Sequence, residues 1–225
     1  MTDERQHHLE SVFNRLKSLL SDLMESARSA LINSIDALDR LDGDKARKIV
    51  AADSKIDELQ RRIDKDICSY IARFQPLAGD LRYVITMVKL ATDLERIGDE
   101  AVNIAEVAIE YEGTRLAKPL IHIKQMTAIV EKMMDDIMLA YYNRDLELAT
   151  DVWEQDEKVD DIYSYIKKEV SEKLMEHPDE IMTKQFIDLV LVARFLERAA
   201  DHITNIAEEI YFISRGKNLK EEIGN

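Results

Sequence analysis

Two pairs of acidic residues, each pair four positions apart, could bind a metal ion. The stretch "DLERIGDE" contains Glu95 and Asp99, and "FLERAADH" contains Glu197 and Asp201. Residues four apart lie on the same face of an α-helix, so each pair places two carboxylates side by side. Carboxylate oxygens are the ligands that hard divalent cations prefer in proteins.

Each pair belongs to a longer stripe of oxygen-bearing side chains beside an apolar helix face. With 100° per residue, the apolar residues between positions 90 and 108 fall within about 80° of Leu94. The stripes that border this core face are Glu95, Asp99, Asn103 and Glu106 in the first half and Glu197, Asp201, Asn205 and Glu208 in the second.

Two further acidic pairs interrupt an apolar face in the segment before each stripe. They are Asp53 with Asp57 and Asp156 with Asp160. Consecutive helices joined by a short loop run antiparallel, so each of these pairs should meet the stripe that follows it. Gathering the acids near an apolar face costs several kcal/mol per carboxylate, roughly, unless a cation compensates.

Two kinds of cation could compensate these acids. Arginine would give an ordinary network of ion pairs, and Arg61, Arg62, Arg96 and Arg198 are near in sequence. A metal would give a binding site, which we favour because the pattern occurs twice. Ligands without cysteine or histidine fit Mg²⁺, Ca²⁺, Mn²⁺ or iron better than structural zinc.

The positions of glycine, proline and turn-like stretches divide the chain into helices. The sequence has only six glycines and three prolines in 225 residues, and 34% of its residues are charged. We therefore expect an all-α fold with a frayed tail after position 214. The predicted helices span about 4–41, 44–74, 77–111, 120–142, 145–176 and 179–214.

The chain also contains an internal repeat. The segments 90–106 and 192–208 share nine identities in seventeen positions, and Pro76 and Pro178 keep the same offset of 102. Each half should therefore be a three-helix unit. We predict two tandem three-helix bundles, with residues 1–113 in the first and 114–225 in the second.

Composition excludes several classes of protein and indicates where the protein works. The formal net charge of −14 argues against a nucleic-acid partner and against anionic lipid surfaces. No apolar run is long enough to cross a bilayer. The single cysteine, Cys68, has the spacing of a residue near the core side, and we expect a reducing, cytoplasmic location.

Taken together, the repeated acidic motifs and the stretch "FQPLAGDLR" resemble the PhoU family of phosphate-transport regulators. The resemblance spans nearly the whole chain. In this chain the acidic motifs of the family correspond to Asp53 with Asp57, Glu95 with Asp99, Asp156 with Asp160, and Glu197 with Asp201.

The resemblance implies a negative regulator of phosphate uptake and of the phosphate-starvation response. It implies an adaptor between the ATPase subunit of a phosphate ABC transporter and a sensor histidine kinase. It also implies a homodimer and multinuclear metal clusters on the acidic motifs, with iron favoured and Mn, Mg, Ca or Zn as alternatives.

Two rival functions are weighed against this adaptor. A metal-dependent phosphoesterase would need a general acid or base beside the motifs, and none stands out; we therefore expect no enzyme. A metal-free helical scaffold would hold its acids in ion pairs alone. The halves also differ, because Asp93 and Glu100 stand where the second half has Phe195 and His202. We expect His202 on the helix surface, outside the metal ligands.

Overall fold

The computed structural model describes residues 2–116, 119–176 and 180–223. The described residues form helices and their connections, with no strand among them, which confirms the all-α prediction. Six predicted helices are present with ends that differ by at most two residues. The helices are α1 (Thr2–Arg40), α2 (Gly43–Phe74), α3 (Ala78–Glu110), α4 (Ile121–Asn143), α5 (Leu146–Glu176), α6 (Glu180–Arg215) and α7 (Leu219–Ile223).

The short helix α7 corrects the prediction of a frayed tail for residues 219–223; residues 224–225 lie outside the described range. Leu219 is only 1% exposed, so the tail has an apolar anchor. The side-chain Oδ1 of Asn218 accepts a hydrogen bond from the backbone N–H of Lys220 at 3.0 Å, which satisfies one donor at the start of the helix.

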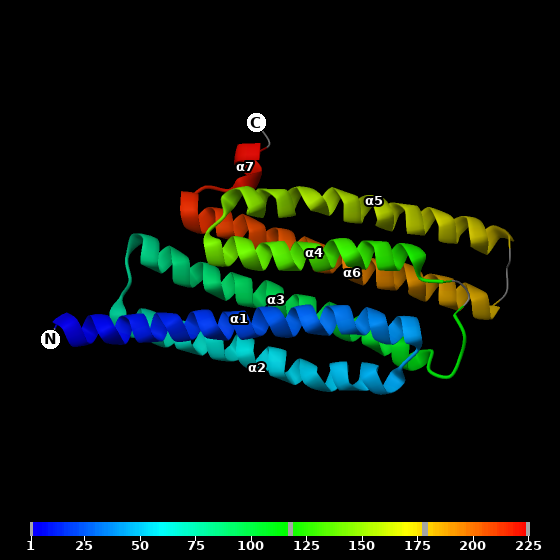
Figure 1. The fold of residues 1–225 in the computed structure, drawn as a ribbon, viewed down its shortest axis with the longest axis horizontal. Helices are drawn as coiled ribbons and strands as arrows, with labels where there is room; N and C mark the ends of the chain where they lie inside the picture. Colours follow the sequence, from blue (N-terminus) through cyan, green and yellow to red (C-terminus); the bar gives the residue numbers. More distant parts are fainter. Residues whose placement is uncertain (1, 117–118, 177–179, 224–225) are drawn as a thin grey trace.

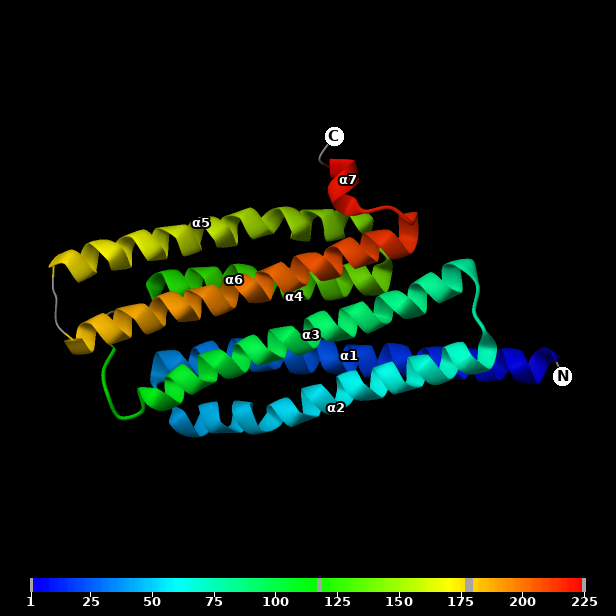
Figure 2. The same ribbon diagram turned by 180° about the vertical axis from the view of Figure 1, so that it is seen from behind.

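The six long helices form two three-helix bundles that lie side by side (Figure 1). Helices α1 to α3 form one bundle and α4 to α6 form the other, as the repeat predicts. Helices α3 and α6 make most of the contact between the bundles, and the view from behind shows the same arrangement (Figure 2). The predicted boundary between residues 113 and 114 falls in the connection from α3 to α4.

Local chemistry sets helix boundaries, and the starts of α2 and α5 use the same device in the two halves. Asp42 Oδ1 accepts a hydrogen bond from the backbone N–H of Lys45 at 2.9 Å, and Asp145 Oδ1 accepts one from the backbone N–H of Leu148 at 3.0 Å. Such side-chain acceptors satisfy donors in the first turn of α2 and α5. Gln75 adopts a left-handed conformation with a φ of 49°, which ends α2 directly before Pro76.

Apolar side chains from both bundles form one continuous core. Met126, Met133 and Met134 are fully buried in it, as their helical spacing indicates. The prediction that Cys68 lies near the core is wrong, because this thiol is exposed. It follows the buried Ile67 directly, and one residue turns a helix by about 100°.

Candidate metal centres

The first acidic cluster consists of Asp53 and Asp57 on α2 with Glu95 and Asp99 on α3. Burial, followed by the charges of Asp57 and Asp99, raises the pKa of Asp53 above its ordinary value. Burial also raises the pKa of Glu95, and the charges of Asp99, Asp57 and Asp53 act in the same direction. The two antiparallel helices thus bring these carboxylates into mutual repulsion, as the sequence predicts.

Gly98 allows α2 and α3 to approach closely at this cluster. A Cβ atom at Gly98 would lie 3.0 Å from Ile56 Cδ1 and 3.6 Å from Asp53 Oδ1. Ile56 is only 3% exposed and has little room to move. The corresponding residue of the second repeat is Ala200, so the two halves do not pack identically here.

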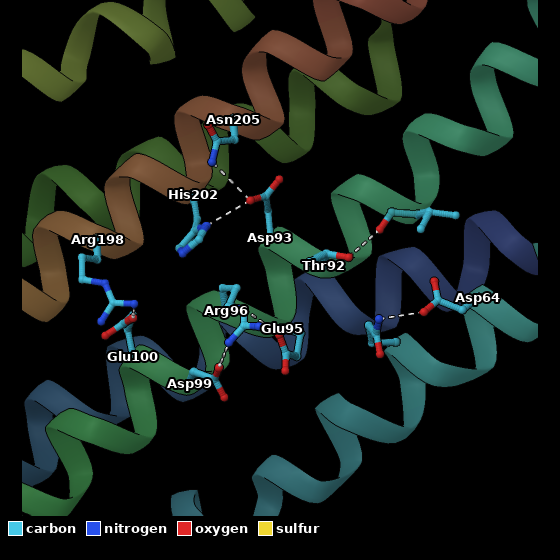
Figure 3. A network of polar contacts seen from close by, with 12 residues as sticks. Asp64, Thr92, Asp93, Glu95, Arg96, Asp99, Glu100, Arg198, His202 and Asn205 are labelled. Atoms are coloured by element: carbon cyan, nitrogen blue, oxygen red, sulfur yellow. Dashed lines mark hydrogen bonds and ion pairs between the residues drawn. The ribbon is translucent and has the colours of Figure 1, made fainter.

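Arginines neutralise part of the first acidic cluster. Arg96 Nη1 lies 3.1 Å from Asp99 Oδ2, and Arg96 Nε lies 3.5 Å from Glu95 Oε2 (Figure 3). Arg61 Nη2 lies 3.6 Å from Asp57 Oδ2. Asp53 Oδ1 is buried, and among the described residues it has no hydrogen-bond partner. Ion pairs therefore account for three of the four acids but leave the buried Oδ1 of Asp53 unsatisfied.

The second acidic cluster consists of Asp156 and Asp160 on α5 with Glu197 and Asp201 on α6. Burial, followed by the charges of Asp201, Asp160 and Glu197, raises the pKa of Asp156 to about 7. Burial and neighbouring carboxylates also raise the pKa of Glu197 and of Asp201. At neutral pH this cluster therefore carries more negative charge than its surroundings stabilise.

Two buried oxygens of the second acidic cluster have no hydrogen-bond partner within the described part of the chain. They are Asp156 Oδ1 and Glu197 Oε2. Glu197 is 8% exposed, and its other oxygen pairs with Arg194. A buried acceptor without a partner costs about 1–3 kcal/mol, more if it is charged. A bound cation would remove that cost.

Both clusters border open clefts. Asp156, Asp160 and Asp201 line a cleft of 1440 Å³ in the second bundle, with Arg194, His202 and Lys220 also on its walls. Asp53 lines a smaller cleft of 520 Å³ that is bordered by α1, α2 and α3. A hydrated ion can therefore reach either cluster from solvent.

The other four predicted ligands lie differently from the two clusters. Asn103 Nδ2 donates to Glu100 Oε2 at 3.1 Å, and Asn205 Nδ2 donates to Asp93 Oδ1 at 3.3 Å. Glu208 Oε1 accepts from the indole of Trp153 at 3.2 Å. Glu106 is exposed to solvent. The structure thus brings the paired acids together, while the ends of the stripes have other surroundings.

The donor set of the clusters fits a hard cation, but the side chains are not arranged as a finished coordination sphere. Over residues 2–116, 119–176 and 180–223, no three His, Cys, Asp or Glu side chains converge on a position that could hold one ion. Carboxylates without a counter-ion repel one another and separate. Metal binding would therefore require rotamer changes that bring the oxygens of each cluster closer together.

Contacts between α3 and α6 include a histidine–carboxylate contact and an ion pair that sequence reasoning missed (Figure 3). His202 Nδ1 lies 2.9 Å from Asp93 Oδ1, and Arg198 Nη2 lies 3.0 Å from Glu100 Oε1. His202 is half-buried between the bundles, so its expected place on the free helix surface is wrong. The sequence did contain a sign of this interface, because Asp93, Glu100 and His202 are positions at which the two repeats differ.

A match to a protein-family model identifies the family of this chain. The PhoU domain matches residues 20–108 and 123–210, one match in each bundle. The chain belongs to the PhoU family. Membership agrees with the doubled acidic motifs and with the contact between α3 and α6, which joins two copies of one PhoU domain.

Curated PhoU relatives match over almost the whole chain. The PhoU homolog 1 of Thermotoga maritima is 34% identical over 95% of this chain and 92% of its own length. The homolog of Caulobacter vibrioides is 35% identical over 96% of this chain and 95% of its own length. Both are named phosphate-specific transport system accessory proteins. These names describe no enzyme, in agreement with our expectation.

Solved PhoU structures have the same fold. The crystal structure of PhoU from Pseudomonas aeruginosa matches with a TM-score of 0.88 and 30% identity, over 92% of this chain and 99% of that one. PhoU from Streptococcus pneumoniae matches with a TM-score of 0.79 and 26% identity, over 97% and 99%. None of the helices in the described residues is both long and apolar enough to span a membrane.

Proposed function

We propose that this PhoU-family protein is a negative regulator of phosphate uptake and of phosphate-starvation signalling. It acts as an adaptor between the ATPase subunit of a phosphate ABC transporter and a sensor histidine kinase. The observation that carries the proposal is the match over more than nine-tenths of the chain to proteins named as accessory to phosphate-specific transport. We place the protein in the cytoplasm as a homodimer that neither inserts into the membrane nor binds nucleic acid.

The adaptor binds metal at its two acidic clusters. The support for this part is the set of buried, unpartnered oxygens on Asp53, Asp156 and Glu197. Iron is the favoured metal, with Mn, Mg, Ca or Zn as alternatives. A bound cation would supply the positive charge that the clusters lack and would hold the second and third helix of each bundle together.

The chain's own residues set how each site would work. In the first cluster Asp53 and Asp57 face Glu95 and Asp99 across the close contact that Gly98 permits. In the second cluster Glu197 offers one free oxygen, because Arg194 already holds the other. With the acids neutralised, each bundle would present a rigid outer surface to its partners.

Exposed apolar side chains at the start of α3 offer a surface for testing partner contact. Leu77, directly before α3, is 79% exposed, and Leu81 and Ile85, one turn apart on α3, are 36% and 44% exposed. Exposed apolar side chains on one face often mark protein contacts. Their replacement leaves the acidic clusters intact.

Co-purification with the transporter ATPase tests the adaptor role. We expect the tagged wild-type chain to retain the ATPase from cells grown with abundant phosphate. A Leu77→Asp, Ile85→Asp variant should lose it while keeping its helical circular dichroism, whereas Lys65→Gln on α2 serves as a surface control. The regulatory proposal is wrong if the wild-type protein never retains the ATPase and if cells that lack this PhoU-family protein take up phosphate at an unchanged rate.

A further inference from the structure

The short helix α7 brings a lysine to the cleft that borders the second acidic cluster. Lys220 Nζ lies 2.7 Å from Glu208 Oε1, the same oxygen that accepts a hydrogen bond from Trp153. Lys220 also lines the 1440 Å³ cleft beside Asp156 and Asp201. Its positive charge acts on these two aspartates as well, because it lowers the pKa of each against the stronger effect of burial.

The two clusters differ in how they obtain positive charge. In the first, Arg96 pairs with Asp99 and Glu95. The corresponding arginine of the second repeat is Arg198, which instead crosses to Glu100 in the other bundle. Asp201, the counterpart of Asp99, does not receive this arginine. Arg194 on α6 pairs with Glu197 and acts on Asp201 most strongly among the basic residues, and Lys220 adds a further positive charge from outside the repeat.

The tail holds Lys220 in place by contacts that are local to it. Leu219 is buried, and Glu222 pairs with Lys217 at 2.5 Å and with the hydroxyl of Tyr211. The Lys220 side chain itself remains 58% exposed. A half-exposed ion pair of this kind is weak, so a divalent cation can displace it.

We propose that Lys220 is a tethered counter-ion that competes with a divalent cation for the second acidic cluster, so that metal binding there promotes the release of α7. The inference rests on the proposed metal binding. Without metal, the ammonium group offsets part of the negative charge of the cluster and adds to the anchor that Leu219 gives α7. With metal bound, the lysine is repelled and α7 is held by its other contacts alone, so it leaves the cleft more often and exposes the rim around Glu208 and Trp153.

Mn²⁺ binding to the full chain tests the competition. An Asp53→Asn, Asp57→Asn background removes the α2 acids of the first cluster, so the remaining binding belongs to the second. In this background, calorimetry should show that Lys220→Gln binds Mn²⁺ about threefold to fivefold more tightly, because a weak competing ion pair is gone. Lys65→Gln, which removes an exposed lysine of the other bundle, should leave the affinity unchanged.

Hydrogen exchange tests the release of α7. In the chain with Lys220 intact, Mn²⁺ should speed amide exchange in residues 219–223, and excess chelator should reverse the effect. The inference is overturned if Mn²⁺ binds but Lys220→Gln has unchanged affinity, or if exchange in α7 does not respond. If neither chain binds Mn²⁺, the proposed metal site is wrong and the inference is wrong with it. This outcome differs from Mn²⁺ binding that Lys220→Gln leaves unchanged, which overturns the inference alone.

Discussion

Arg198 on α6 and Glu100 on α3 form an ion pair across the boundary between the two bundles, with Nη2 and Oε1 3.0 Å apart. The Glu100 side chain is 1% exposed and that of Arg198 is 44% exposed. Burial raises the pKa of Glu100, although a hydrogen bond from Asn103 and the charge of Arg198 favour the ionised form. The pair therefore places one fully buried charge where the bundles meet.

Replacing Arg198 by leucine should destabilise the protein by about 1–3 kcal/mol, below the usual loss for a fully buried pair because the arginine is partly solvated. Denaturant unfolding at pH 8 gives the value. The loss should shrink at pH 5, where Glu100 can take up a proton. Arg40→Leu, which breaks a surface pair with Asp36, should cost less than about 0.5 kcal/mol. Equal losses for the two variants would contradict a structural role for the interbundle pair.

The metal-free protein should become less stable as the pH rises from about 4 to about 7. The pKa of Asp156 is raised to about 7, mainly by burial and then by Asp201, from an ordinary value of 3.8. Between these values the folded state binds more protons than the unfolded state, so stability falls with rising pH. After allowance for partial exposure, we expect roughly 1–3 kcal/mol from Asp156. Chemical unfolding in chelator, compared between wild type and Asp156→Asn, isolates this contribution.

Asp156→Asn should have opposite effects with and without metal. In chelator at pH 8 the variant should be more stable than wild type, because one carboxylate of a repelling group is gone. With Mn²⁺ at about 100 times its dissociation constant, wild type should gain about 2.7 kcal/mol per site, and the variant should gain less. Thermal unfolding with and without Mn²⁺ measures both effects. A variant that is less stable than wild type in chelator would show that the acids do not repel.

Gly98→Ala and Gly79→Ala should change stability in opposite directions. At Gly98 a Cβ atom meets Ile56 Cδ1 at 3.0 Å, and overpacking a core costs about 1–3 kcal/mol, which exceeds the gain in helix propensity of about 0.5–1 kcal/mol. At Gly79 nothing lies within 4 Å, so only the gain in helix propensity should remain. Denaturant unfolding of both variants compares them. Stabilisation by Gly98→Ala would mean that α2 and α3 separate easily.

Helix positions and the repeat could be predicted from the sequence because they depend on local signals. Apolar spacing and the prolines at 76 and 178 place the helices within two residues. Antiparallel neighbours then bring Asp53 toward Glu95 and Asp156 toward Glu197, so that the charge of Asp53 acts on the pKa of Glu95 and the charge of Glu197 acts on that of Asp156. Helical spacing and the antiparallel order of neighbouring helices were together enough to predict that these acids lie near one another.

Contacts between the bundles could not be predicted in the same way. The repeat fixes each three-helix unit but not which faces of the two units meet, so the partners of Glu100 and His202 were missed. The position of Lys220 was missed for a related reason. The five-residue helix α7 depends on the burial of Leu219 against the rest of the protein. Such features depend on tertiary packing rather than on helical periodicity.

Elemental analysis of the purified chain tests the metal clusters most directly. The protein should be prepared without metal-affinity steps, and wild type should be compared with Asp53→Asn, Asp57→Asn and with Asp156→Asn, Asp201→Asn. We predict at least one transition-metal ion, iron foremost, at each cluster of wild type, and loss of the metal of one cluster in each variant. A folded wild-type protein without bound metal, and without metal uptake after anaerobic incubation with Fe²⁺ or Mn²⁺, would contradict the presence of these centres.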